Sequence, residues 1–114
     1  MKDCIFCRIV NGQLPAEVVY EDDAVMAFKD IKPAAPVHIL IISKKHISTL
    51  ADAREEDKEL LGHILLVVNK LAEQFGLEKG FRLINNCGAD GGQVVFHLHF
   101  HLLGGRKLNP SLGV

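Results

Sequence analysis

The chain has 114 residues, of which 48% are hydrophobic and 24% charged, and its formal net charge is −1. This balance is typical of a globular domain that buries a core without disulfides, so we treat residues 1–114 as a single domain. Its basic and acidic residues are mixed without a polybasic run, which argues against binding to nucleic acid or to an anionic membrane. The charged opening residues do not resemble a signal peptide, and no apolar run reaches the ~20 residues of a membrane span. The sequence therefore predicts a cytoplasmic protein.

The first half of the chain has the features of strands. Residues 16–30 contain two apolar segments around the turn residues 21–23, which predicts a hairpin. Pro33 and Pro36 bracket an extended segment that leads into a third strand at 37–43.

One long helix is predicted over about residues 52–75. Asp52 and Glu55 have the spacing of a capping box, and Gly76 stands at the expected stop. Apolar residues recur at helical spacing along this segment, which gives it one broad buried face.

Two more strands are expected at 80–87 and 94–103, joined by a glycine-rich turn. With a further short helix, the elements predict an α+β fold, a five-stranded antiparallel sheet with one long helix. A sheet this small leaves an edge or a face exposed, and a homodimer that extends the sheet would cover it.

The last predicted strand carries three histidines at alternate positions. Because successive side chains of a strand point to opposite faces, His97, His99 and His101 share one face. The other face is expected to pack on the helix through Val94, Phe96, Leu98, Phe100 and Leu102. The outer imidazoles would start about 13 Å apart, too far to share one zinc ion at ~2.0–2.1 Å from each nitrogen. The row instead suits an extended anion such as a phosphate, which can contact two imidazoles.

The heptapeptide HLHFHLL, residues 97–103, matches the His-φ-His-φ-His-φ-φ pattern of the histidine triad (HIT) family. The segments LPAEVVYEDD, AFKDIKPAAPVHILIISKKHI, LLGHIL and GFRLINNCGADGGQ also resemble the branch of that family that hydrolyses purine nucleoside phosphoramidates. The resemblance covers nearly the whole chain and implies a HIT-like fold.

This resemblance also implies roles for individual residues. His99 would attack the α-phosphorus of a nucleotide, His101 would bind the phosphate oxygens, and His38 would orient the ring of His99. Asp30 would accept hydrogen bonds from the ribose hydroxyls. The remaining nucleotide-binding residues would be Asn86, Gly92 and Gln93 at the phosphate and Phe6, Ile9, Leu14, Phe28 and Ile31 at the base, where core packing is the alternative for the apolar ones. Some family members have a hydroxyl residue where this chain has Val94, which leaves the leaving-group preference open.

Cys4 and Cys7 form a CxxC pair, which is half of a zinc site by spacing. His46 and His97 are the candidates for the other two ligands, and a subset of the HIT family uses such a Cys₂His₂ set. A closed four-ligand site would make the zinc structural. The alternative is a pair of buried or oxidisable thiols.

The resemblance therefore implies a homodimeric hydrolase that releases AMP from adenosine 5′-phosphoramidates or from acyl or aminoacyl adenylates. Three alternatives are a dinucleoside polyphosphate hydrolase, a nucleotide-binding scaffold with incidental catalysis, and a metal-activated hydrolase.

Overall fold

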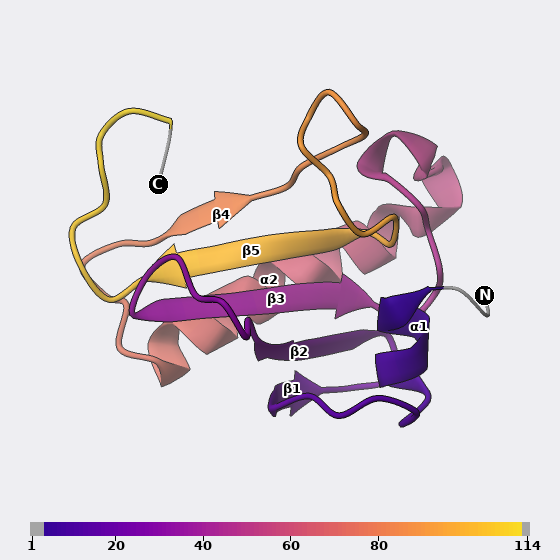
Figure 1. Ribbon diagram of the computed structural model, residues 1–114, viewed down its shortest axis with the longest axis horizontal. Coiled ribbons are helices and arrows are strands. Elements are labelled where there is room, and N and C mark those ends of the chain that lie inside the picture. Colours follow the sequence, from indigo (N-terminus) through magenta and orange to yellow (C-terminus); the bar gives the residue numbers. More distant parts are fainter. Residues whose placement is uncertain (1–3, 113–114) are drawn as a thin grey trace.

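The structure, a computed structural model, describes residues 4–112 and has a five-stranded antiparallel sheet at its centre (Figure 1). The strands span Val18–Glu21 (β1), Val25–Lys29 (β2), Val37–Ser43 (β3), Arg82–Ile84 (β4) and His99–Gly104 (β5). Their order is β1-β2-β3-β5-β4, so the last strand lies between β3 and β4. This architecture confirms the predicted α+β fold with five antiparallel strands.

Two α-helices cover opposite faces of the sheet. The 17-residue α2, Lys58–Gln74, packs on one face, and the six-residue α1, Ile5–Val10, packs on the other (Figure 1). Two single 3₁₀ turns, Leu50–Asp52 and Glu55–Asp57, precede α2. Within residues 4–112, no helix is long and apolar enough to span a membrane.

The long helix begins at Lys58, so its predicted start at Asp52 is wrong. The Asp52 carboxylate accepts a hydrogen bond from the Thr49 hydroxyl at 2.9 Å, and the residues that follow form the 3₁₀ turns. The Asp57 carboxylate accepts the backbone N–H of Arg54 at 2.9 Å, which closes the second 3₁₀ turn, and it makes no capping hydrogen bond to α2. The predicted stop is confirmed, since Gly76 has φ +72° just after the helix.

The last strand begins at His99, not at Val94. Leu98, Phe100 and Leu102 are buried with the α2 face as predicted, whereas Val94 and Phe96 are 87% and 46% exposed. The chain bends over residues 95–97 before the ladder begins. The prediction that Val94 and Phe96 belong to the core is therefore wrong.

The register places β5's histidines opposite the apolar residues of β3. His99 pairs with Ile42, and His101 pairs with Leu40. The cluster on this face of the sheet, which α1 covers, comprises Phe6, Met26, Phe28, Leu40 and Ile42. The histidines therefore lie on a largely apolar, covered surface and not on an open one.

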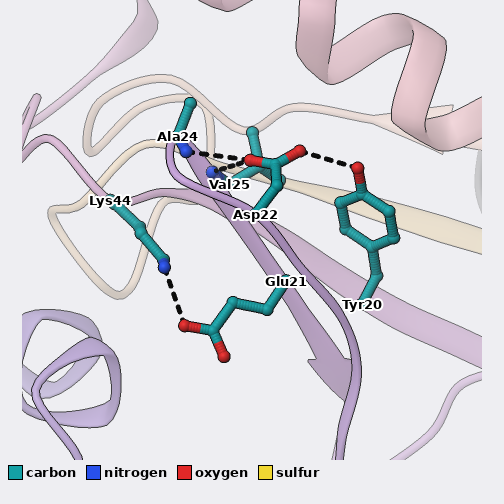
Figure 2. A network of polar contacts seen from close by, with 6 residues as sticks. All are labelled: Tyr20, Glu21, Asp22, Ala24, Val25 and Lys44. Atoms are coloured by element: carbon teal, nitrogen blue, oxygen red, sulfur yellow. Dashed lines mark hydrogen bonds and ion pairs between the residues drawn. The ribbon is translucent and has the colours of Figure 1, made fainter.

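The turn between β1 and β2 is fixed by the carboxylate of Asp22 (Figure 2). One oxygen accepts the backbone N–H groups of Ala24 and Val25 at 2.8 and 2.9 Å, and the other accepts the Tyr20 hydroxyl at 2.6 Å. His63 of α2 donates to the same second oxygen at 2.6 Å. Burial alone would raise the pKa of Asp22, but these hydrogen bonds hold it well below its usual value. Asp22 thus fastens the hairpin to the helix.

Replacing Asp22 by Ala should lower the free energy of unfolding by about 2–3 kcal/mol, because four donors lose their acceptor. Urea unfolding at neutral pH measures this. Glu21→Ala is the matched control: its ion pair with Lys44 is solvent-exposed and should contribute less than about 1 kcal/mol (Figure 2). Equal losses for the two variants would contradict this account of Asp22.

Candidate active site and metal cluster

The three histidines of the HLHFHLL segment serve two adjacent groups of side chains. His99 and His101 lie in β5 on the face that α1 covers, and His97 lies in the bend just before the strand. His97 is fully buried and His99 is 6% exposed. The ring of His97 turns toward the cysteines, whereas the other two rings lie side by side with centroids 5.1 Å apart.

The four predicted metal ligands meet in one cluster. Nδ1 of His97 lies 3.1 Å from Cys4 Sγ, 3.5 Å from Cys7 Sγ and 3.2 Å from Nδ1 of His46. Nδ1 of His46 lies 3.2 Å from Cys7 Sγ, and all four ligand atoms are within 4.8 Å of one another. Because Cys4 caps α1 and Cys7 lies in its first turn, the cluster joins α1 to the bend that carries His97.

The donor set fits a tetrahedral zinc ion. Zinc bonds of ~2.0–2.1 Å to nitrogen and ~2.3 Å to sulfur place neighbouring ligands about 3.3–3.8 Å apart, close to the distances of this cluster. His97 Nε2–H donates to the Ser43 carbonyl at 2.6 Å, so the unprotonated Nδ1 faces the other three ligands. Burial raises the pKa of Cys7, as does its neighbour Cys4, and a cation would favour the thiolates. The cluster could therefore hold a metal ion.

His99 has a defined tautomer. Its Nδ1–H donates to the backbone carbonyl of His97 at 2.7 Å, so the lone pair of the neutral ring is on Nε2. Phe6 of α1 packs edge-on against this ring, with centroids 5.1 Å apart. The family resemblance implied that His38 orients the ring of His99. In the structure the His97 carbonyl makes the hydrogen bond to that ring, and His38 contacts His101 instead.

His38 instead orients His101. The backbone N–H of Ala34 donates to His38 Nδ1 at 3.0 Å, so the proton of neutral His38 is on Nε2. That nitrogen lies 2.9 Å from His101 Nδ1 and 3.5 Å from Asp30 Oδ2. His101 therefore accepts through Nδ1 and carries its own proton on Nε2, where it can donate to an anion.

Asp30, His38 and His101 also form a group of metal-ligand types within 4.8 Å of one another. The tautomers distinguish this group from the cysteine cluster. In the cysteine cluster a lone pair of His97 faces the other ligands, whereas here the N–H of His38 does. This second group is therefore built to pass hydrogen bonds rather than to hold a cation.

Burial keeps the histidines of the site neutral at pH 7. It lowers the pKa of His38 and of His99, although Asp30 opposes this in both. Burial lowers the pKa of His101 to about 4, and its neighbours His99 and His38 add to the effect. A neutral His99 can act as a nucleophile without first losing a proton.

The remaining predicted site residues are only partly gathered. Phe6 and Phe28 are buried beside the histidines with ring centroids 5.6 Å apart, and Ile9 packs against their cluster. Ile31 is 93% exposed, which places its side chain in solvent and not in this cluster. Leu14, Asp30 and Asn86 are half-buried, and Gly92 has φ +83° in the turn before β5.

Gln93 is a structural element of the glycine-rich turn. Its side-chain nitrogen donates to the carbonyls of Ser48 and Val95, and its side-chain oxygen accepts from Gly88 N–H at 2.8 Å. Both amide protons are therefore engaged within the protein. Gly91 is required in the same turn because a Cβ there would lie 2.4 Å from the Cys87 carbonyl oxygen.

Sequence reasoning missed two contributors to the site. The backbone N–H of Ala34 fixes the tautomer of His38, and no residue type could have indicated this. The side chain of Asn85 donates to the His99 carbonyl at 2.9 Å, and it differs from Asn86 in sequence only by its position.

Comparison with known proteins shows the family and the fold. The sequence pattern of the HIT domain family matches residues 11–108. An uncharacterized HIT-like protein from Synechococcus elongatus is 52% identical over 94% of both chains. The crystal structure of a HIT family hydrolase from Legionella pneumophila superposes with a TM-score of 0.95 at 51% identity, covering 97% of this chain and all of that one.

The fold similarity extends to a more distant relative. The crystal structure of a histidine triad nucleotide-binding protein from Candida albicans superposes with a TM-score of 0.81 at 32% identity, over 98% of this chain and 86% of that one. The chain belongs to the HIT domain family. The family resemblance inferred from the histidine motif is thereby confirmed.

The buried state of His101 predicts a pH-dependent stability. Its pKa of about 4 in the folded protein lies below the ordinary value of about 6.5, so between these values the unfolded chain binds more protons. The stabilisation that comes from keeping His101 neutral is therefore fully present above about pH 6.5 and is lost as the pH falls toward 4. Urea unfolding measures this at pH 7 and at pH 5. Between these two values the free energy of unfolding of His101→Gln should fall by about 2 kcal/mol less than that of the wild type. Equal losses would contradict the assigned pKa.

Proposed function

We propose that this protein hydrolyses purine nucleoside 5′-phosphoramidates, or acyl or aminoacyl adenylates, through a nucleotidyl-histidine intermediate and releases AMP. The observation that carries the proposal is the hydrogen bond from His99 Nδ1–H to the His97 carbonyl. It leaves an unprotonated Nε2 on the residue that matches the family's nucleophile. The Legionella relative is described as a hydrolase and the Candida relative as a nucleotide-binding protein, which supports hydrolysis and nucleotide binding as the general activity.

In the proposed first step His99 Nε2 attacks the α-phosphorus, and the bond from phosphorus to the leaving group breaks. An amine leaving group takes up a proton from water as it departs, whereas a carboxylate leaves as the anion. The new imidazolium charge is stabilised by the His97 carbonyl that already accepts the Nδ1–H of His99. His101 Nε2–H donates to a phosphate oxygen, held in place by His38. Asp30 lies beside His38 and would accept the ribose hydroxyls. Water then attacks the phosphorus, the bond from phosphorus to His99 Nε2 breaks, and a water proton passes to solvent. AMP is released and His99 returns to its neutral form with the proton on Nδ1.

His99→Ala should abolish the intermediate. Rapid quenching of the wild type with adenosine 5′-phosphoramidate should give a nucleotidyl adduct in the intact-protein mass, and the variant should give none. Its kcat should fall by about three orders of magnitude or more, since the nucleophile itself is lost. His63→Ala is the matched control. The His63 ring is hydrogen-bonded to Asp22 and takes no part in the proposed reaction, so this variant should still form the adduct. Comparable turnover by His99→Ala and wild type would refute the proposal.

Two further measurements separate the alternatives. Side-by-side turnover of a diadenosine polyphosphate and the phosphoramidate tests the choice of substrate class. If His99→Ala leaves the cellular phenotype intact while a variant that cannot bind nucleotide loses it, the nucleotide-binding scaffold is the better reading.

We also propose that Cys4, Cys7, His46 and His97 hold a structural zinc ion. Four protein ligands close the coordination shell, so the ion would stabilise the fold and not bind substrate. The ion would tie α1, and with it Phe6, to the bend that carries His97. Such a tether matters because a six-residue helix is not stable by itself.

Chelation should therefore destabilise the protein before it affects chemistry. The purified protein should contain about one zinc per chain, and removing it should lower Tm by more than about 5 °C. Cys4→Ser should have the same effect, whereas Cys87→Ser, at a cysteine outside the cluster, should leave zinc content and Tm unchanged. If chelation abolished turnover while Tm stayed constant, metal-activated hydrolysis would be the better account.

A homodimer is the third part of the proposal. Leu65 and Leu66 of α2 are 50% and 62% exposed, and the three-residue β4 is an edge strand of the sheet. An apolar helix surface and an open edge are features that a second copy of the chain could cover, with the sheet extended across the dimer.

A further inference from the structure

The residue that follows β4, Asn85, contacts the main chain of the proposed nucleophile. Its side-chain Nδ2 donates to the backbone carbonyl of His99 at 2.9 Å, across 14 positions of sequence, in a part-buried setting. His99 is the first residue of β5. The hydrogen bond therefore acts where the strand that carries the nucleophile begins.

This carbonyl lies beyond the end of the β4–β5 pairing. The last residues paired by the two strands are Ile84 and His101, and the chain then leaves β4 for the glycine-rich turn. The Asn85 amide supplies a donor where a longer β4 would have supplied a backbone N–H. The side chain thus extends the support of β5 to His99 without extending the strand.

The contact complements the other restraints on His99. Ile42 of β3 pairs with it on one side, and the His97 carbonyl fixes its ring through Nδ1. Asn85 holds the main chain from the β4 side. Because in-line attack requires Nε2 to be placed within a fraction of an ångström, a shift of the His99 backbone would misdirect the attacking lone pair.

We propose that Asn85 is a positioning residue for the nucleophile His99 and acts through the His99 carbonyl. This inference rests on the proposed function. Asn85 has no contact of its own with the phosphate in this account. Its loss should therefore slow the formation of the nucleotidyl-histidine and leave substrate binding unchanged.

Asn85→Ala and Asn85→Leu both remove the donor without adding charge, and Asn85→Gln keeps an amide donor on a longer side chain. The first two should lower kcat for adenosine 5′-phosphoramidate about tenfold with KM within about twofold of the wild type. Asn85→Gln should recover part of the loss. Asn69→Ala, on the exposed surface of α2, is the matched control and should match the wild type. Rates are normalised to the folded fraction measured by circular dichroism, so that misfolded protein does not count.

A second readout needs no substrate. The exchange rate of the His99 Nδ1 proton, measured by NMR, should rise about tenfold in Asn85→Ala relative to the wild type and Asn69→Ala. A kcat within twofold of the wild type for both donor-free variants, or a raised KM at constant kcat, would overturn the proposal. If the wild type forms no adduct, the proposed function has failed. The proton exchange then decides the positioning role alone: faster exchange in Asn85→Ala supports it, and unchanged exchange overturns it.

Discussion

His97 joins the two sites of this protein through its ring and its backbone. Its Nδ1 belongs to the cysteine cluster, its Nε2–H is held by the Ser43 carbonyl, and its own carbonyl accepts the Nδ1–H of His99. Only Leu98 separates the member of the cysteine cluster, His97, from the proposed nucleophile, His99. Whatever fixes the bend before β5 also fixes the tautomer on which the proposed chemistry depends.

Burial determines the protonation state of the histidines in the site. Rings that are ionisable in water are enclosed by Phe6, Phe28 and the apolar residues of β3, which favours their neutral forms. A hydrogen bond then fixes the tautomer of each neutral ring. The Ala34 N–H fixes that of His38, His38 fixes that of His101, and the His97 carbonyl fixes that of His99. The result is one unprotonated nitrogen beside one N–H donor, a pairing suited to attack on a phosphorus atom whose oxygens accept hydrogen bonds.

The periodicity of the sequence predicted the strand faces but not the strand ends. Leu98, Phe100 and Leu102 pack on α2 as the two-residue repeat indicated, because that repeat is a direct consequence of strand geometry. Val94 and Phe96 continue the same repeat outside the core, since the Gln93 amide anchors the glycine-rich turn and the chain bends after it. A repeat cannot show where a ladder begins when a long-range hydrogen bond decides it.

The sequence indicated which residues gather in the candidate site, but it did not indicate which of them are hydrogen-bonded to one another. The cysteine spacing indicated Cys4 and Cys7, and His46 and His97 were the candidates that the family resemblance supported. The ligand atoms of these four residues lie within 4.8 Å of one another. The partner of His38 is 63 residues away and could not be distinguished between His99 and His101 by type or spacing. Asn85 and Asn86 are equally unresolved by sequence, because the choice depends on where β4 ends.

The central claim is the tautomer of His99, and ¹⁵N NMR of the histidine rings in the resting protein at pH 7 tests it most directly. The account predicts that neutral His99 carries its proton on Nδ1, whereas His38, His97 and His101 carry theirs on Nε2. A proton on Nε2 of His99 would contradict the account, because the nitrogen assigned to the attack would then have no free lone pair.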